Sequence, residues 1–298
     1  MLGGLAGLWG LLIGMRPLYD NSFLTHFATG RVMLERGGVP RTDPYSFTAG
    51  GDPWVVQSWL ASLVYAGAED LGGLGAVRLV NGVLCALLAV AVWTLTARSQ
   101  SIVIRVAITI AVLVGAAEMW SGRPLLFGLL GLAAVLLVAD DHLDPRWLVP
   151  VGWVWVNTHG SFPFAVVLLA LVAVGARLDR GSWGPEVRAL GWASVGLLLG
   201  AVNPLGPRLL FFPLTVGARS EAFESVVEWQ APSYRSWSQL LVVGLLLVAV
   251  LGLVRAPRWR DALPLVVFGG LALTSARNQA PLLLVLIPVL AGAVVHLG

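Results

Sequence analysis

The chain has no lysine, a single cysteine and few charged residues of either sign. All 19 basic residues are arginine, and charged residues make up only 12% of the 298 positions. A soluble domain of this length carries about 25% charged residues on its surface. Hydrophobic residues reach 57% of the chain, and the mean hydropathy is +0.83. Half of the usual polar surface is therefore missing, and we expect lipid to take the place of water around much of the protein.

These absences exclude several classes of function. With Cys85 alone there is no disulfide framework and no thiolate metal site, so we expect this side chain to pack in the interior. The arginines are scattered singly, which argues against a nucleic-acid partner, and their use in place of lysine indicates the codon bias of a GC-rich bacterium. The apolar stretch from Leu2 to Met15 lacks a basic flank and a cleavage site, so it is interpreted as a retained first helix.

Long apolar runs dominate what is present. A membrane-spanning helix needs about 20 mostly apolar residues, although spans broken by glycine or proline look shorter in the sequence. The sequence therefore predicts an all-α, polytopic transmembrane bundle of about ten spans that forms a single membrane domain over residues 1–298. The predicted spans are 2–16, 75–97, 102–120, 124–139, 147–158, 161–177, 188–203, 237–254, 261–275 and 279–297.

The arginines predict the sidedness of these spans. Basic residues collect in the cytoplasmic loops of membrane proteins, and here they fall in alternate short connections. Both termini are therefore predicted on the cytoplasmic side of a bacterial inner membrane. The connections concerned hold Arg98 with Arg105, Arg146, Arg177 with Arg180 and Arg188, and Arg255 with Arg258 and Arg260.

Two long segments, 16–73 and 204–236, then lie outside the cell membrane. The stretch from Trp54 to Ala68 is apolar enough to suggest a further span, but that span would break the alternation of the arginines. We therefore predict an interfacial helix on the outer face, with Trp54 and Trp59 at the level of the lipid headgroups. The polar side chains of the first segment cannot face lipid, so they are expected to form a folded cap or to line a cavity.

Two carboxylates of the first segment are candidate catalytic groups. Asp20 follows the first span by a few residues, where it could act as a general base on an acceptor hydroxyl. The alternative is a charge that simply ends a helix. Asp43 lies in the extended run VPRTDPYSFTAGGDPW, where it either faces the cavity as a second acid or forms an Asx turn.

Further polar candidates lie in a predicted interfacial helix and at the outer ends of the spans. His26 and Arg31 share the segment SFLTHFATGRVMLERGGVP, where His26 could bind a phosphate oxygen or a metal, or could serve as a hydrogen-bonded structural residue. No second histidine stands at metal-ligand spacing, so no cofactor is expected, although a divalent metal is left open. The outer span ends hold Glu118, Arg123, Asn157, His159, Asn203, Glu228, Arg277 and Asn278.

Ionisable groups beside spans by default mark a functional pathway, so a shared polar cavity is expected at this membrane face. Arg123 and Arg277 would bind a phosphate there, because a guanidinium matches its oxygens in a bidentate fork. The alternative is that the two arginines pair with Glu118 and Glu228 and hold helices together.

The order of these motifs resembles bacterial polytopic relatives of the GT-C glycosyltransferases, a superfamily that includes protein mannosyltransferases and the aminoarabinose transferases of lipid A. The resemblance touches nearly the whole chain and is most specific from Asp20 to Leu60. It is carried by Asp20 and then HFATG, GGVPRTDPYSFTAGGDPW, SWL, GRP, WVNTHGSF, NPLG, EW and ARN. It implies transfer of a sugar from a polyprenyl phosphate carrier to an acceptor at the outer membrane face, with the carrier-linked sugar and membrane lipid as partners.

The resemblance also implies roles for individual residues. Asp20 would be the base, Arg123 and Arg277 would contact phosphate, and the cavity would hold His26, Asp43 and His159. The predicted substrate-binding set is completed by Arg31, Asn157, Asn203 and Glu228. Relatives commonly carry a second acid two residues after the first, where this chain has Ser22. The alternatives from other classes are a transporter or flippase of a lipid-linked solute and a non-catalytic membrane protein of the same fold.

Overall fold

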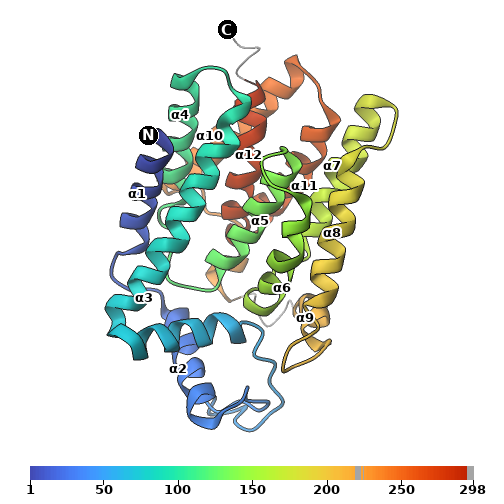
Figure 1. The fold of residues 1–298 in the computed structure, drawn as a ribbon. Coiled ribbons are helices and arrows are strands. Elements are labelled where there is room, and N and C mark those ends of the chain that lie inside the picture. The colour runs from blue at the N-terminus through green and yellow to red at the C-terminus, as the bar shows by residue number, and fades with distance from the viewer. Residues whose placement is uncertain (219–222, 224, 294–298) are drawn as a thin grey trace.

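A computed structural model describes residues 1–218, 223 and 225–293 (Figure 1). The all-α prediction is confirmed: the described residues contain helices and one isolated bridge, Thr42 to Pro53, but no strand. The α-helices are α1 Leu2–Gly14, α2 Asn21–Arg36, α3 Trp59–Leu95, α4 Ile102–Ala116, α5 Leu125–Ala139, α6 Leu148–Thr158, α7 Phe164–Arg180, α8 Pro185–Leu199, α9 Arg208–Ala218, α10 Trp237–Arg255, α11 Trp259–Thr274 and α12 Gln279–Ala293. Short 3-10 turns are η1 Thr96–Arg98, η2 Pro145–Trp147, η4 Val227–Trp229 and η5 Ala276–Asn278.

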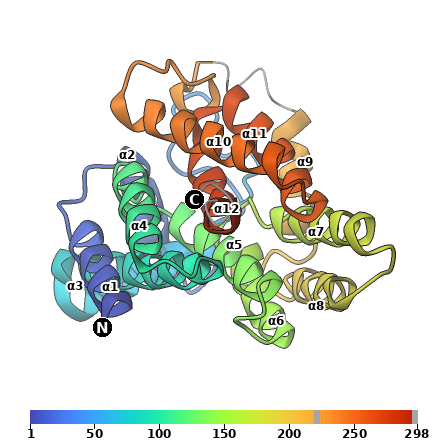
Figure 2. The same ribbon diagram turned by 90° about the horizontal axis from the view of Figure 1, so that it is seen from above.

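Most of these helices run side by side in one bundle. Seen from above in Figure 2, α12 lies in the middle and contacts α10 and α11 on one side and α4 and α5 on the other. The residues from Ala280 to Ala291 are accordingly buried all around the helix, as expected for a helix with no polar face. Each predicted span overlaps a helix of this bundle, whereas α2 and the start of α3 form a cap across one end (Figure 1).

Two of the described helical segments, Trp59–Arg98 and Trp237–Arg255, are long and apolar enough to cross a membrane. Leu2–Gly14, Ile102–Ala116, Leu125–Ala139, Arg208–Ala218 and Ala276–Gly292 are apolar but shorter. A helix of 15 residues, such as α5, is about 22 Å long, which is less than the hydrocarbon core of a typical bilayer. The number of about ten spans therefore stays a prediction.

The helix α3 changes direction at two glycines. Gly72 (φ −162°, ψ 25°) and Gly73 (φ 64°, ψ −165°) leave the helical conformation, and the positive φ of Gly73 is one that a side chain would oppose. The part before the break lies across the end of the bundle, and the part after it runs along α1 (Figure 1). The apolar run from Trp54 onward therefore supplies both a cap helix and a helix of the bundle.

The predicted helix from Trp54 to Ala68 begins later than expected. A backbone hydrogen bond from Trp54 N to Arg41 O (2.8 Å) keeps the chain extended there, and α3 begins only at Trp59. The depth of Trp59 relative to the lipid headgroups stays a prediction. Its side chain is buried, and the indole N–H donates to Asn157 Oδ1 at 2.8 Å.

Glycines let α1 approach α3 backbone to backbone. A Cβ atom at Gly10 would lie 2.3 Å from the carbonyl oxygen of Cys85, and one at Gly14 would lie 2.4 Å from that of Asn81. Small residues spaced one turn apart are how helices come this close in membrane proteins. Cys85 is buried in this contact, which confirms that it packs in the interior.

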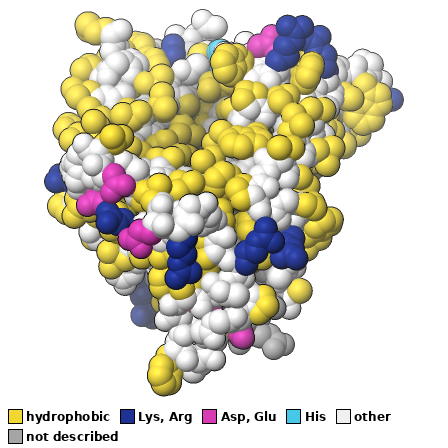
Figure 3. All heavy atoms as spheres, turned by 60° about the horizontal axis from the view of Figure 1, so that its bottom comes forward, with side chains coloured by type: hydrophobic (Ala, Val, Ile, Leu, Met, Phe, Trp, Pro, Cys, Tyr) yellow, Lys and Arg dark blue, Asp and Glu magenta, His cyan; other side chains and the backbone are white. Residues whose placement is uncertain are grey.

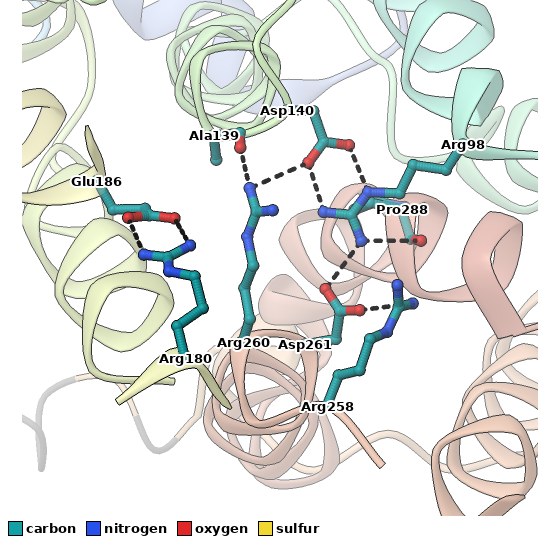
Figure 4. Close-up of polar contacts among 9 residues, drawn as sticks. All are labelled: Arg98, Ala139, Asp140, Arg180, Glu186, Arg258, Arg260, Asp261 and Pro288. Carbon is teal, nitrogen blue, oxygen red and sulfur yellow. Dashed lines mark hydrogen bonds and ion pairs between the residues drawn. The ribbon is translucent and has the colours of Figure 1, made fainter. Parts of the chain in front are cut away.

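Buried ion pairs join the helices at the end opposite the cap (Figure 4). Arg98 donates to Asp140 at 2.9 Å and to Asp261 at 2.9 Å, and Arg258 pairs with Asp261 at 2.7 Å. Arg260 also contacts Asp140, at 3.8 Å. The side chains of Asp140 and Asp261 are only 4% and 5% exposed. The start of α1 and the end of α12 lie at this same end, since Gly3 is next to Trp93 and Gly292 next to Arg258.

Candidate functional site

A cavity of about 610 Å³ lies at the capped end of the bundle. Its wall combines α2, the starts of α5 and α7, the helix α9 and the turns η4 and η5. Its polar lining includes Ser22, His26, Gln57, Ser58, Arg123, His159, Ser161, Glu228, Arg277 and Asn278, and its aromatic lining is Phe164, Phe212, Phe223 and Trp229. The cavity therefore brings together five of the predicted site residues, namely His26, Arg123, His159, Glu228 and Arg277.

Asp20 is the N-cap of α2 and lies just behind this wall. Its Oδ1 accepts hydrogen bonds from the backbone N–H and the hydroxyl of Ser22 at 2.9 and 2.7 Å, and its Oδ2 accepts from the Ser121 hydroxyl at 2.7 Å. Burial raises the pKa of the Asp20 carboxyl, but the hydrogen bonds from Ser121 and Ser22 and the charge of Arg123 outweigh it and hold the pKa below its usual range. Asp20 is thus an ionised helix cap that contacts two lining residues, Ser22 and Arg123.

Arg123 stands between two carboxylates. Its Nη1 donates to Glu228 Oε2 at 2.7 Å, and its Nε lies 3.5 Å from Asp20 Oδ2. The Nε atom is buried and makes no hydrogen bond within the described part of the chain. Glu118 is not a partner, because it accepts instead from Ser238 at 3.1 Å. The predicted alternative of arginine pairing with Glu228 therefore holds for Arg123.

Arg277 is held differently. Its guanidinium lies over the Trp229 ring, 4.0 Å from the centroid, and Trp229 in turn stacks on Phe223 at 4.6 Å. Burial lowers the pKa of Arg277, opposed by the charge of Glu228. Among residues 1–218, 223 and 225–293, no ion pair or hydrogen bond forms at this guanidinium. Arg277 therefore offers its donors to the cavity.

The two histidines are neutral at ordinary pH. Burial lowers the pKa of His159 to about 3, helped by the charges of Arg277 and Arg123. Burial also lowers the pKa of His26 to about 4, with Arg123 adding to it and Asp20 opposing it. A backbone N–H can only donate, so the contact of Ser161 N with His159 Nδ1 (3.3 Å) makes Nδ1 an acceptor and leaves the ring proton on Nε2. His159 is therefore a neutral donor.

The position of His159 depends on the absence of a side chain on α5. A Cβ atom at Gly128 would lie 2.8 Å from His159 Nδ1 and 2.7 Å from Ser161 Oγ. The same serine hydroxyl accepts from the indole N–H of Trp155 at 3.1 Å and contacts His159 Nδ1 at 2.7 Å. This chain of contacts fixes the orientation of the imidazole.

Two predicted site residues of the first outer segment lie away from the cavity. Asp43 is half-buried, and its Oδ1 accepts from the backbone N–H groups of Tyr45 (2.7 Å) and Ser46 (3.1 Å). These hydrogen bonds hold the pKa of the Asp43 carboxyl below its usual range. The prediction of a second cavity acid is therefore wrong, and the Asx-turn alternative holds. Arg31 pairs with Glu69 (2.7 Å) and Asp70 (3.1 Å) and also does not line the cavity.

Two asparagines of the predicted substrate-binding set hold the fold rather than line the cavity. Asn157 is fully buried, accepts from Trp59 and donates to Trp153 O at 2.7 Å, so it fixes the cap part of α3 to α6. Asn203 donates to Gly200 O at 2.6 Å and accepts from Leu205 N at 2.7 Å, as a turn-forming residue does.

The sequence analysis missed several residues that border the cavity. The aromatic pair Phe223 and Trp229 and the hydroxyl of Ser161 were not predicted, although Trp229 adjoins Glu228 and Ser161 lies two residues after His159. These side chains are aromatic or carry a hydroxyl, whereas the predicted set was chosen mainly for ionisable groups. No group of three or more His, Cys, Asp or Glu side chains in the described ranges is arranged to hold a metal ion.

Comparisons of the chain with protein-family models, with curated proteins and with solved structures find no match.

Proposed function

We propose that this chain is a multi-pass membrane glycosyltransferase of the GT-C type, which moves a sugar from a polyprenyl phosphate carrier to an acceptor at the outer face of the bacterial cytoplasmic membrane. The observation that carries the proposal is the arrangement of the cavity. Arg123 and Arg277 line the same cavity as neutral His159, and the ionised carboxylate of Asp20 lies 3.5 Å from Arg123.

The surface of the bundle supports the membrane part of the proposal. Long apolar side chains lie exposed along α10, including Leu240 (54%), Leu247 (58%) and Val254 (73%). A water-soluble monomer rarely exposes so continuous an apolar face. Figure 3 shows hydrophobic side chains spread over the visible face, with arginines and acidic residues in small groups.

The proposed topology follows from the two ends of the bundle. About ten helices cross the bilayer, and those shorter than the hydrocarbon core reach across it with their flanking turns. The end with Arg98, Arg258 and Arg260 faces the cytoplasm together with both termini. The capped end, with the cavity, faces outward.

The proposed reaction needs positive charge and a base. The acceptor oxygen attacks the anomeric carbon, the bond from that carbon to the phosphate oxygen breaks, and the polyprenyl phosphate leaves with the electron pair. Arg277, Arg123 and the Nε2–H of His159 stabilise the leaving phosphate. Asp20 takes the proton of the acceptor hydroxyl, which displaces one of the serine hydroxyls from the carboxylate. Attack opposite the leaving group inverts the configuration of the sugar.

The test is transfer in membranes supplied with a labelled polyprenyl phosphate sugar. Asp20→Asn is expected to abolish transfer with unchanged protein abundance. Asp43→Asn is the matched control, because it removes an acid from the same outer segment but away from the cavity, and it should retain activity. Full activity of Asp20→Asn would refute the catalytic assignment, and solute flux in proteoliposomes without covalent change would identify a transporter instead.

A further inference from the structure

We propose that Glu228 is an internal competitor of the substrate phosphate: its carboxylate binds the Arg123 guanidinium in this structure and leaves it when a phosphate anion enters the cavity. This inference rests on the proposed function, because it takes the phosphate of a lipid carrier as the entering anion. It assigns to Glu228 the control of phosphate affinity, a role distinct from the substrate contact that the sequence predicted.

The two carboxylates beside Arg123 are bound unequally. Asp20 is 17% exposed and accepts hydrogen bonds from Ser22 and Ser121. The Glu228 side chain is 39% exposed, and its contact with Arg123 is the one hydrogen bond that its carboxylate makes within the described residues. A half-exposed carboxylate regains water when it turns outward, so its departure costs less than that of a buried one. Glu228 is therefore the carboxylate that exchanges.

The exchange requires a side-chain rotation rather than a loop movement. The backbone of η4 is fixed to the turn η5, since the Ser275 hydroxyl donates to Glu228 O at 3.1 Å and Ala276 N donates to Gln230 O at 2.9 Å. Trp229, the next residue in η4, carries Arg277 on its ring. A phosphate drawn in by Arg277 therefore arrives beside Glu228, and the two anions meet at Arg123.

The charges around the cavity make the contact of Glu228 with Arg123 unfavourable once a phosphate is present. Among the described side chains that line the cavity or contact its lining, Arg123 and Arg277 are balanced by Asp20 and Glu228, and His26 and His159 are neutral. A phosphate that entered with Glu228 in place would set three anionic groups against two guanidiniums, and like charges in a partly buried site repel strongly. When Glu228 turns outward, Arg123 gains a phosphate oxygen as its partner and the balance is restored.

Removal of the Glu228 charge should therefore strengthen phosphate binding. The variant Glu228→Gln keeps the size of the side chain but gives up the ionic contact, and about tenfold tighter binding is expected, a gain of about 1.4 kcal/mol. A residue that contacted the substrate favourably would give the opposite result.

The experiment titrates the full chain in lipid nanodiscs with a polyprenyl monophosphate that carries no sugar. A parallel titration with inorganic phosphate separates the headgroup from the lipid tail, and the gain in affinity is expected for both. The matched control is Glu118→Gln, which removes a carboxylate at the same end of the bundle that is bonded to Ser238 and does not line the cavity. Its affinity should equal that of the unaltered protein. Glu228→Ala, which removes the carboxylate altogether, is a second variant with the same expected gain.

The outcomes separate this inference from the proposed function. Equal or weaker binding by both Glu228 variants overturns the competition while phosphate binding itself stands. A lack of binding by every variant and by the unaltered protein overturns the proposed function as well. A gain with inorganic phosphate alone assigns the site to a free anion and overturns the lipid carrier as its ligand.

Discussion

Arg98 and Asp261 are 163 residues apart in the chain, yet the guanidinium of one donates to the carboxylate of the other at 2.9 Å. The same guanidinium donates to Asp140 and, at 3.3 Å, to the carbonyl of Pro288. One side chain after α3 thus joins α5, α11 and α12 (Figure 4).

The first prediction concerns the stability of this cluster. Asp261→Asn leaves the largely buried Arg98 short of a counter-charge, so it should destabilise the protein by about 3 kcal/mol. The control is Asp70→Asn, which breaks an ion pair to Arg31 whose side chains are 43% and 54% exposed, and it should cost less than about 1 kcal/mol. Thermal unfolding in detergent measures both. Equal shifts of the two midpoints would show that burial of the cluster has no energetic effect.

The second prediction concerns acid stability. His26 and His159 have pKa values lowered from 6.5 to about 4 and about 3, so between these values and 6.5 the unfolded chain binds more protons than the folded one. The contribution of the two neutral rings to the free energy of unfolding is therefore complete above pH 6.5 and is lost as the pH falls below that value. The unfolding temperature should drop between pH 7 and 5, and less steeply in His26→Gln. His142→Gln, at an exposed histidine, is the control and should keep the slope of the unaltered protein.

The third prediction concerns the space beside His159. In Gly128→Ala the added methyl group meets His159 Nδ1 and Ser161 Oγ, so the ring has to shift. Transfer should fall by about tenfold, since small displacements of a positioned group lower the rate steeply. Gly191→Ala adds a methyl group with no neighbour within 4 Å and should leave the rate unchanged. Activity of Gly128→Ala equal to that of the control would show that His159 takes no part in the reaction.

The fourth prediction concerns the shape of the cation at Arg277. Arg277→Lys keeps a positive charge but loses the planar group that stacks on Trp229 and presents several donors. We expect about tenfold weaker binding of polyprenyl phosphate with little change in unfolding temperature. Arg31→Lys, at an arginine outside the cavity, should bind normally. Unchanged binding by Arg277→Lys would mean that charge alone is recognised.

The helices and the gathering of polar residues at one end were predictable from the sequence. Apolar runs interrupted by glycine and proline predict helices even when no tertiary contact is known. Charged groups beside such runs avoid apolar surroundings, so they are expected to gather in a shared polar cavity. This reasoning correctly grouped His26, Arg123, His159, Glu228 and Arg277, which come from five separate elements or connections.

The choice between open alternatives was not predictable. Asp20 and Asp43 both precede turns or helices, but Asp20 lies 3.5 Å from Arg123 in the structure, whereas Asp43 accepts hydrogen bonds from the backbone of its own turn. The pairing of Arg123 with Glu228 joins residues 105 positions apart, and no local pattern specifies such a pair. The start of α3 at Trp59 depends on the backbone hydrogen bond between Trp54 and Arg41, which a hydropathy profile does not contain.

The two ends of the bundle differ in how firmly their helices are joined. Buried ion pairs connect η1, α5 and α11 at one end, whereas the turn η5 between α11 and α12 borders the cavity at the other. Under the proposed function, a ligand would bind at the end where η5 borders the cavity, while the ion pairs of Arg98 hold the opposite end of the bundle together.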